Sequence, residues 1–307
     1  MADKPVIVGV DGSEESLLAA EWAALEAQRR GTSLRIVSAP LPSPRVHAYH
    51  AYHAYHASPA AVADALRAVS ARALDAARLR SEAAAPGVPV EACLLSGPPA
   101  LAMAGSGWDA SLLVVGARGA GGFAAMVLGS VSRYAAMHAA CPVVVVRLES
   151  MAVHREIAVG VRDPQEAGEA LAFAFDEAAM RGADLIVVHA WSGYPAALHL
   201  PVEGEDVELR PADPEQITAA AVSGLAVALK KWQDKYPGVR VRHDVIHGHP
   251  AWALAGYSTR ADLVVLGRHD GGSAGKVGIG TIQHAVLNHA RGPVAIVPSA
   301  ATATWAE

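Results

Sequence analysis

The stretch from Gly116 to Ser132, GARGAGGFAAMVLGSVS, combines glycines and hydroxyl side chains in a pattern that suits phosphate binding. Its spacing is G-x2-G-x9-G-S. Gly116 and Gly119 allow the backbone to approach a ligand closely. Gly129 and Ser130 stand where a helix begins, and the free N–H groups at such a position attract anions. The stretch therefore predicts a phosphate-binding turn.

The spacing differs from two familiar phosphate-binding motifs. It matches neither the dinucleotide-binding G-x-G-x-x-G nor the P-loop G-x4-G-K-[ST], and it contains no lysine to reach a terminal phosphate. Ser130 and Ser132 offer hydroxyl donors to phosphate oxygens, and Arg118 offers positive charge. Each of these residues alone would be interpreted as a helix cap or a solvated loop residue. We therefore base the prediction on their joint spacing.

A turn of this kind needs a strand before it and a helix after it, and the sequence provides both. The apolar run at 112–115 predicts a buried strand, and the apolar spacing over 131–138 predicts a helix. The same alternation fills the first half of the chain. We expect further strands at 4–10, 33–39, 88–95 and 142–147, and helices at 13–31, 59–84 and 98–107. Strands that alternate with helices predict an α/β fold, with a parallel sheet covered on both faces.

The pattern then restarts in a constant register. Identical residues recur 151 positions apart: Gly9 and Gly160, Gly31 and Gly182, Leu34 and Leu185, Gly97 and Gly248, Pro99 and Pro250, Gly116 and Gly267, Gly129 and Gly280, Pro142 and Pro293. Such a match without gaps indicates a duplicated unit. We expect two tandem domains at 1–149 and 155–299 and a tail at 300–307. Each domain ends in a strand whose open edge could pair with the other's.

Length and composition exclude several classes of protein. With 307 residues, 52% of them hydrophobic and 18% charged, the chain is long enough for two globular domains. Its formal charge of −5 and scattered basic residues argue against a nucleic-acid-binding protein. The N-terminus carries no signal-peptide pattern, and no apolar run approaches 18 residues. We therefore expect a cytoplasmic protein that binds neither nucleic acid nor membranes.

On these motifs the first half resembles the universal stress protein family. The residues that carry the resemblance are VDGS at 10–13, GPP at 97–99, and the G-x2-G-x9-G-S stretch followed by Val131 and Ser132. The resemblance covers nearly all of both halves, and the chain looks like a tandem-domain member of the ATP-binding branch. It implies two open five-stranded parallel sheets, Rossmann-like and of the adenine nucleotide α-hydrolase type. It also implies pairing of the two domains within the chain, a homodimer, and ATP as the ligand, with or without Mg²⁺.

The resemblance also implies a role for each matching position. Asp11 would lie near the adenosine moiety, and Ala39 would offer backbone contacts to adenine. The phosphate loop would be lined by Gly116, Arg118 and Gly119, and the phosphates would be cradled by Gly129, Ser130, Val131 and Ser132. This agrees with the chemistry, because ligands of open α/β sheets bind beyond the carboxyl ends of the strands, where a carboxylate can accept hydrogen bonds from a nucleoside.

The second half departs from this pattern. Arg162, Asp163 and Pro164 replace Asp11, Gly12 and Ser13, Asp270 replaces Gly119, and Gln283 replaces Ser132. An aspartate in the loop adds negative charge beside an anion, and a residue with a Cβ atom resists the glycine conformation. Gly267, Gly280 and Thr281 remain as a weak second site. We expect little or no ATP binding there, unless Arg162 meets a phosphate from another direction.

A histidine-rich run, His47 to His56, repeats HAY with period three. Imidazoles at this density could bind Zn²⁺ or Ni²⁺, but the period suits neither one helical face nor a tetrahedral site. We interpret the run as a low-complexity expansion beside the nucleotide cleft and expect no metal site. The dispersed histidines are interpreted as structural: His138, His189, His249 and His284.

Several functions remain open. As a binding module, the protein would be a nucleotide-linked stress sensor or a regulator of an unidentified partner protein. As an enzyme, it would be a slow ATP hydrolase or phosphotransferase; the missing P-loop lysine and Walker-type acid argue against efficient turnover, so we assign no catalytic residue and expect at most a weak ATPase. A third possibility is a scaffold that binds no nucleotide.

Overall fold

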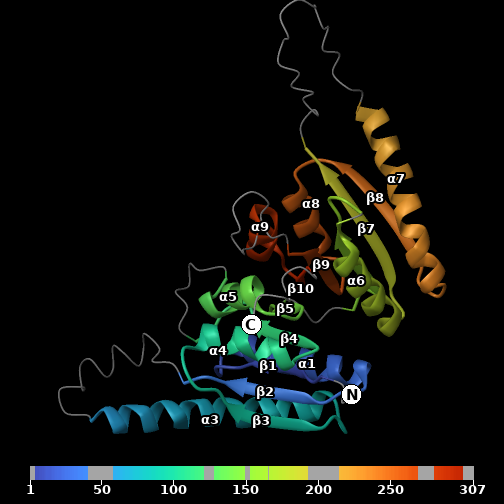
Figure 1. The fold of residues 1–307 in the computed structure, drawn as a ribbon. Helices are drawn as coiled ribbons and strands as arrows, with labels where there is room; N and C mark the ends of the chain where they lie inside the picture. The colour runs from blue at the N-terminus through green and yellow to red at the C-terminus, as the bar shows by residue number, and fades with distance from the viewer. Residues whose placement is uncertain are drawn as a thin grey trace, which may run out of the picture.

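The computed structural model describes residues 4–40, 58–120, 128–148, 153–164, 166–192, 214–268 and 280–299, and its elements repeat in the same order in both halves (Figure 1). The first half contains β1 (Val6–Gly9), α1 (Glu14–Arg30), β2 (Leu34–Ser38), α3 (Pro59–Ala84), β3 (Val90–Leu94), α4 (Pro99–Ser106), the short helix η1 (Gly107–Asp109), β4 (Leu112–Gly116), α5 (Ser130–His138) and β5 (Val143–Val146). The second contains β6 (Glu156–Gly160), α6 (Gly168–Arg181), β7 (Asp184–Trp191), α7 (Pro214–Lys235), β8 (Val241–His247), α8 (Pro250–Tyr257), β9 (Leu263–Gly267), α9 (Thr281–His289) and β10 (Val294–Val297).

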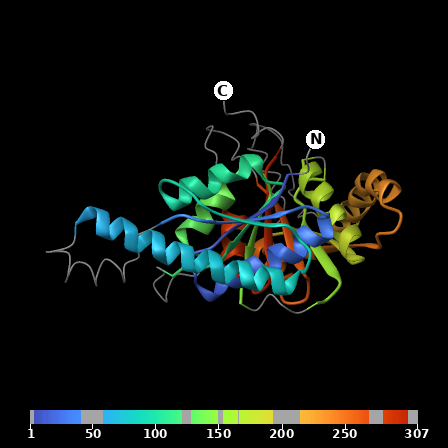
Figure 2. The ribbon, with the colours of Figure 1, turned by 90° about the horizontal axis from the view of Figure 1, so that it is seen from below.

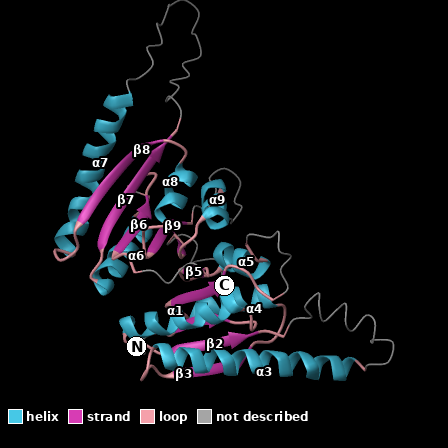
Figure 3. Cartoon of the chain, turned by 180° about the vertical axis from the view of Figure 1, so that it is seen from behind, coloured by secondary structure: helices cyan, strands magenta, loops and turns pink. Residues whose placement is uncertain are grey.

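The strands form one sheet in the order β3-β2-β1-β4-β5-β10-β9-β6-β7-β8. Neighbours within each half are parallel, and β5 and β10 meet antiparallel, with Val144 opposite Ala295. Figure 1 labels β5 and β10 where the two halves meet, and Figure 3 shows the molecule from behind. The α/β class and the parallel sheet of each half are confirmed, and the two open edges have joined into a continuous ten-stranded sheet.

Helices cover both faces of the sheet, because nearly all of its central strand residues are apolar and buried. On one face, α1, α3, α6 and α7 pack around a core that includes Trp22, Leu74, Phe175 and Leu225. On the other face, α4, α5, α8 and α9 pack around Met103, Leu254 and Val286, among other residues. The view from below shows α3 lying across the first half and extending past the edge of its strands (Figure 2).

Equivalent helices end in the same way, as the 151-residue repeat predicts. Gly31 ends α1 with φ 64°, and Gly182 ends α6 with φ 58°. Both are in the left-handed region, which glycine adopts without the steric cost that a Cβ atom imposes. The repeat therefore preserves the local chemistry that stops these helices. Among the described ranges, no helix has the length and hydrophobicity needed to cross a membrane.

A buried group of charges joins α1 to α6, and we call it the inter-half charge cluster: Glu26, Arg29, Arg30, Glu177 and Arg181. Arg181 donates to Glu26 at 2.6 Å and to Glu177 at 2.8 Å. Arg30 donates to Glu26 at 2.8 Å and also bonds Glu177. Both carboxylate side chains are 0% exposed. Each half thus supplies an arginine to the buried glutamate of the other.

Arginines also cross between the halves on the opposite face of the sheet. Arg147, which follows β5, donates to the carbonyl oxygen of Leu287 in α9. Arg268, which follows β9, donates at 2.8 Å to the carbonyl oxygen of Ala139 at the end of α5. Cations at helix C-termini satisfy carbonyl groups that have no partner in the helix. The two halves are therefore linked by polar contacts on both faces of the sheet.

Candidate functional site

The residues predicted to bind phosphate lie where β1 and β4 end side by side. The two strands are parallel neighbours, with Val8 opposite Val114, so the chain after each emerges at the same edge of the sheet. The backbone N–H of Gly129 donates to the carbonyl oxygen of Ala117 at 2.7 Å, which brings the start of α5 back to the end of β4. Residues 121–127 of the turn lie outside the described residues.

Asp11 connects the end of β1 to this turn. Its Oδ1 accepts hydrogen bonds from the backbone N–H and the hydroxyl of Ser13, at 3.0 and 2.6 Å. Its Oδ2 accepts from the backbone N–H of Ala120 at 2.7 Å, and the side chain is exposed. A Cβ atom on Gly119 would lie 2.3 Å from Asp11 Oδ2. A side chain at position 119 would therefore displace this carboxylate from its present position beside the turn.

Gly116 and Arg118 contact the first turn of α1. A Cβ atom on Gly116 would lie 2.8 Å from the backbone carbonyl carbon of Glu15, so the strand end and the helix approach at a distance that only glycine permits. Arg118 donates its backbone N–H and its Nε to the two oxygens of Glu15, at 2.5 and 2.8 Å. The Glu15 side chain is 7% exposed and that of Arg118 is 45% exposed. The Arg118 guanidinium, which was predicted to meet phosphate, therefore already forms an ion pair with Glu15.

The start of α5 has N–H donors without a partner among the described residues. Gly129 precedes the helix and supplies no side-chain cap, and the first helical bond runs from Arg133 N–H to Gly129 O at 3.0 Å. The backbone N–H groups of residues 130–132 therefore have no hydrogen-bond acceptor within the helix itself. The Ser130 side chain is exposed, whereas Ser132 is buried and donates its hydroxyl to the carbonyl oxygen of Gly116 at 2.6 Å. Of the two predicted hydroxyl donors, Ser130 faces solvent and Ser132 holds the turn against β4.

The remaining predicted residues lie beside this group. Val131 is half-buried on α5, and Ala39 is half-buried just after β2, the strand next to β1. Contacts thus bring together Asp11, Gly116, Arg118, Gly119, Gly129 and Ser132, while Ala39 lies at the same end of the sheet. Glu15 was not predicted from the sequence as the partner of Arg118. The sequence signal that could have indicated this pair was the position of Glu15 in the first turn of α1, at the same edge of the sheet as Arg118.

In the second half, Gln283 covers the start of α9. Its Nε2 donates to Gly267 O at 2.9 Å, as the hydroxyl of Ser132 does to Gly116 O. Its Oε1 lies 2.6 Å from the position that a Cβ atom on Gly280 would take, compared with 3.7 Å for Ser132 Oγ and the equivalent position on Gly129. The longer side chain therefore crowds the helix start where an anion would be held, close to Thr281.

The rest of the second half also differs. Arg162 is exposed and pairs with Glu166 at 2.8 Å. His189, which stands in the repeat where Ser38 stands, contacts Val161 O through Nδ1 at 3.0 Å. β7 continues to Trp191, which stacks on His247 at 4.2 Å. β2 of the first half ends at Ser38, whereas the equivalent strand β7 is longer and ends at the stacked rings of Trp191 and His247. The predicted Asp270 lies outside the described residues.

The described histidines do not form a metal site. Among the described residues, no group of three or more His, Cys, Asp and Glu side chains could hold an ion. His249 accepts from the backbone N–H of Ala251 at 3.3 Å and caps α8, which agrees with its structural interpretation. The run from His47 to His56 lies outside the described residues.

Comparisons with known proteins agree with the repeat. The family model described as Universal stress protein family matches residues 3–147 and again residues 154–298. Universal stress protein Rv2005c of Mycobacterium tuberculosis is 33% identical over 304 residues, covering 95% of this chain and 96% of that protein. A crystal structure of a universal stress protein from Archaeoglobus fulgidus has the same fold over 97% of both chains, with a TM-score of 0.68 and 18% identity. A universal stress protein crystallised in complex with cAMP is 28% identical and covers 48% of this chain and 98% of its own, with a TM-score of 0.33.

Proposed function

We propose that this chain, which belongs to the universal stress protein family, binds one ATP in its first half and acts as a nucleotide-linked sensor or regulator of the stress response. The observation that carries this function is the turn at the ends of β1 and β4. There the exposed Asp11 carboxylate, the close-packed Gly119 and the uncapped start of α5 lie at one edge of the sheet. In open α/β sheets, this edge is where ligands bind.

The ligand fits the donors and acceptors of this edge. The Asp11 carboxylate would accept hydrogen bonds from the ribose, and the backbone of Ala39 would contact adenine. The N–H groups of residues 130–132 and the exposed Ser130 hydroxyl would donate to the phosphates, because uncapped helix starts favour anions. The missing Cβ of Gly116 lets the end of β4 approach α1 at Glu15, and that of Gly119 leaves the Asp11 carboxylate beside the turn, so both glycines shape the site.

Bound Mg²⁺ would supply positive charge that the turn lacks. Arg118 is paired with Glu15, and the turn contains no lysine. Hard oxygen ligands such as a carboxylate and phosphate oxygens suit Mg²⁺. We therefore expect Mg²⁺ to strengthen ATP binding more than AMP binding, since the metal neutralises the terminal phosphates.

We favour binding over turnover. The sequence of the turn provides no lysine for the terminal phosphates, and efficient hydrolysis needs such a charge together with a residue that orients water. Slow hydrolysis or phosphotransfer is the second candidate, for which we assign no catalytic residue. A homodimer and a regulatory protein partner would convert nucleotide occupancy into a signal.

Two measurements test the function. Protein purified without added nucleotide is denatured, and the supernatant is analysed by mass spectrometry, where we expect adenine nucleotide. A thermal-shift series with ATP, ADP, AMP and GTP, each with and without Mg²⁺, should show the largest stabilisation with Mg²⁺ and ATP. A ligand at about a thousand times its Kd adds about 4 kcal/mol to the free energy of unfolding. No shift with any nucleotide would favour the scaffold, and rapid phosphate release in single-turnover experiments would favour the enzyme.

A further inference from the structure

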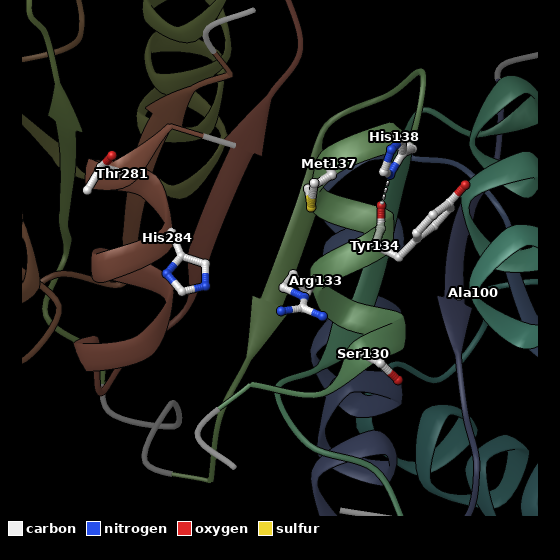
Figure 4. Close-up of a pocket in the computed structure, with 8 residues that line it drawn as sticks. All are labelled: Ala100, Ser130, Arg133, Tyr134, Met137, His138, Thr281 and His284. Carbon is white, nitrogen blue, oxygen red and sulfur yellow. Dashed lines mark hydrogen bonds between the residues drawn. The ribbon is translucent and has the colours of Figure 1, made fainter. Parts of the chain in front are cut away.

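A groove of about 600 Å³ lies between α5 of the first half and α9 of the second, with Ala100 of α4 at its side (Figure 4). This volume is in the range of small-molecule sites. Figure 4 shows Arg133 of α5 and His284 of α9 on its two walls, with Ser130 and Thr281 toward opposite ends. Apart from Ser130, the groove uses none of the residues that line the turn of the first half. It is a cavity at the join between the halves.

The polar groups that line this groove favour an anion. None of its eight lining residues is acidic. The Arg133 side chain is exposed and makes no ion pair or hydrogen bond with the described part of the chain. His284 contacts Asn288 through Nδ1 at 3.2 Å, which leaves its Nε2 available to a ligand. Among the described lining residues, a guanidinium without an acidic partner lies beside an imidazole, and this combination provides charge for a negatively charged group.

One wall also offers a surface for an organic group. Tyr134 and His138 stack with ring centroids 4.0 Å apart, and His138 Nδ1 contacts Tyr134 O at 3.0 Å. Met137 and Ala100 add apolar surface beside them. Aromatic and apolar walls with a few polar groups are typical of sites that bind small organic molecules.

The two halves must both be present to form this site. Arg133 and His284 are one repeat apart in the sequence, and each is the fourth residue of its helix. The duplication therefore places the same repeat position on both walls of the groove. This position is arginine in the first half and histidine in the second. Neither half alone contains the pair.

We propose that this groove binds a small organic phosphate between the two halves. The planar guanidinium of Arg133 would pair with two phosphate oxygens, and His284 Nε2 and the hydroxyl of Thr281 would donate to the remaining one. The stacked rings of Tyr134 and His138 would contact the organic part of the molecule. This site does not require ATP in the turn of the first half.

Calorimetric titration of the full chain with phenyl phosphate tests the site. We expect measurable binding of phenyl phosphate, weaker binding of inorganic phosphate, and none of phenol. This order distinguishes an organic phosphate from free phosphate as the natural ligand. Arg133→Glu should raise the Kd about ten- to a hundredfold, because it removes a charge-assisted pair and adds repulsion. Arg133→Lys should weaken binding less, since it keeps the positive charge and loses only the paired hydrogen bonds that a guanidinium group can make.

Two control variants test whether binding depends on this groove alone. Arg72→Glu makes the same charge change on an exposed face of α3 and should leave the Kd unchanged. Gly119→Ala disturbs the turn of the first half and should also leave it unchanged, even where it abolishes ATP binding. The inference is overturned if phenyl phosphate fails to bind the wild-type chain. It is equally overturned if Arg133→Glu, shown to be folded by circular dichroism, alters the Kd by less than about twofold, or if Gly119→Ala alone removes binding.

Discussion

The guanidinium of Arg181 donates to the carboxylate of Glu26 at 2.6 Å across the boundary between the two halves. The equivalent residues one repeat away, Arg30 and Glu177, make the reciprocal pair. A carboxylate removed from water is costly unless a cation and hydrogen bonds compensate it. Each glutamate also pairs with the arginine of its own half, so each half supplies part of the compensation for the buried charge of the other.

Glu26→Ala should therefore lower the stability of the whole chain. The substitution leaves Arg181 and Arg30 buried with one carboxylate to share, and removing one member of a buried ion pair costs about 3–5 kcal/mol. Urea denaturation measures the free energy of unfolding. The matched control is Glu82→Ala, which removes the exposed partner of Arg78 and should change stability little. Equal losses in the two variants would contradict the structural role of the cluster.

The same cluster should make stability depend on pH. Burial, followed by the charge of Glu26, raises the pKa of Glu177 to about 7. Against the cost of burial, Arg181 and Arg30 hold the pKa of Glu26 below its ordinary value. Between pH 4.5 and pH 7 the folded chain thus keeps a proton on Glu177 that the unfolded chain has released. This contribution is complete below pH 4.5 and is lost as the pH rises through 7.

The expected loss is on the order of 3 kcal/mol in the free energy of unfolding between these limits. Glu177→Gln, which stays neutral, should remove this slope. Urea denaturation of both proteins at a series of pH values makes the comparison. The assignment fails if the variant retains the pH dependence of the wild type.

Gly119→Ala should abolish stabilisation by ATP while the fold is retained. The added methyl group would lie 2.3 Å from Asp11 Oδ2, so the carboxylate or the turn must move. Gly105→Ala is the control, because a Cβ there meets nothing within 4 Å and lies in α4. Thermal shifts with ATP should persist in the control and disappear in the variant. An undiminished shift in Gly119→Ala would place the nucleotide elsewhere.

ATP should bind with a stoichiometry of one per chain. In the second half Gln283 crowds the start of α9, and the sheet edge carries the Trp191–His247 ring pair. Calorimetric titration, checked by counting the nucleotide released per chain on denaturation, measures the ratio. Two equivalent sites would refute the idea that the second half has lost its anion site.

Much of the fold could be predicted because it depends on local patterns. The helix stop at Gly31, the strand run before Gly116 and the 151-residue spacing are each visible in neighbouring residues or in the repeat. The contacts between the halves could not be predicted in the same way. Arg268 and Ala139 lie 129 residues apart, and no local pattern marks them as partners. Such pairs become visible only when the sheet has set the position of both halves.

The candidate site shows the same limit. The sequence identified Ser130 and Ser132 as equivalent hydroxyl donors, but the rotation of α5 turns the second toward Gly116 and leaves the first in solvent. Arg118 was expected to be free for phosphate, and Glu15 neutralises it. The α5–α9 groove could not be predicted from the sequence because its walls come from different halves. The binding of ATP by these residues remains a prediction.

The antiparallel join of β5 and β10 within one polypeptide has a consequence for how the two copies can evolve. If the two halves were identical separate chains, a substitution in their gene would appear in both partners of the dimer. If they were two different chains, like and unlike chains would pair at random. Because one polypeptide carries both halves, each first half is always paired with a second half, at any protein concentration. A substitution in one half, such as Gln283 where the first half has Ser132, therefore alters one partner and leaves its neighbour unchanged.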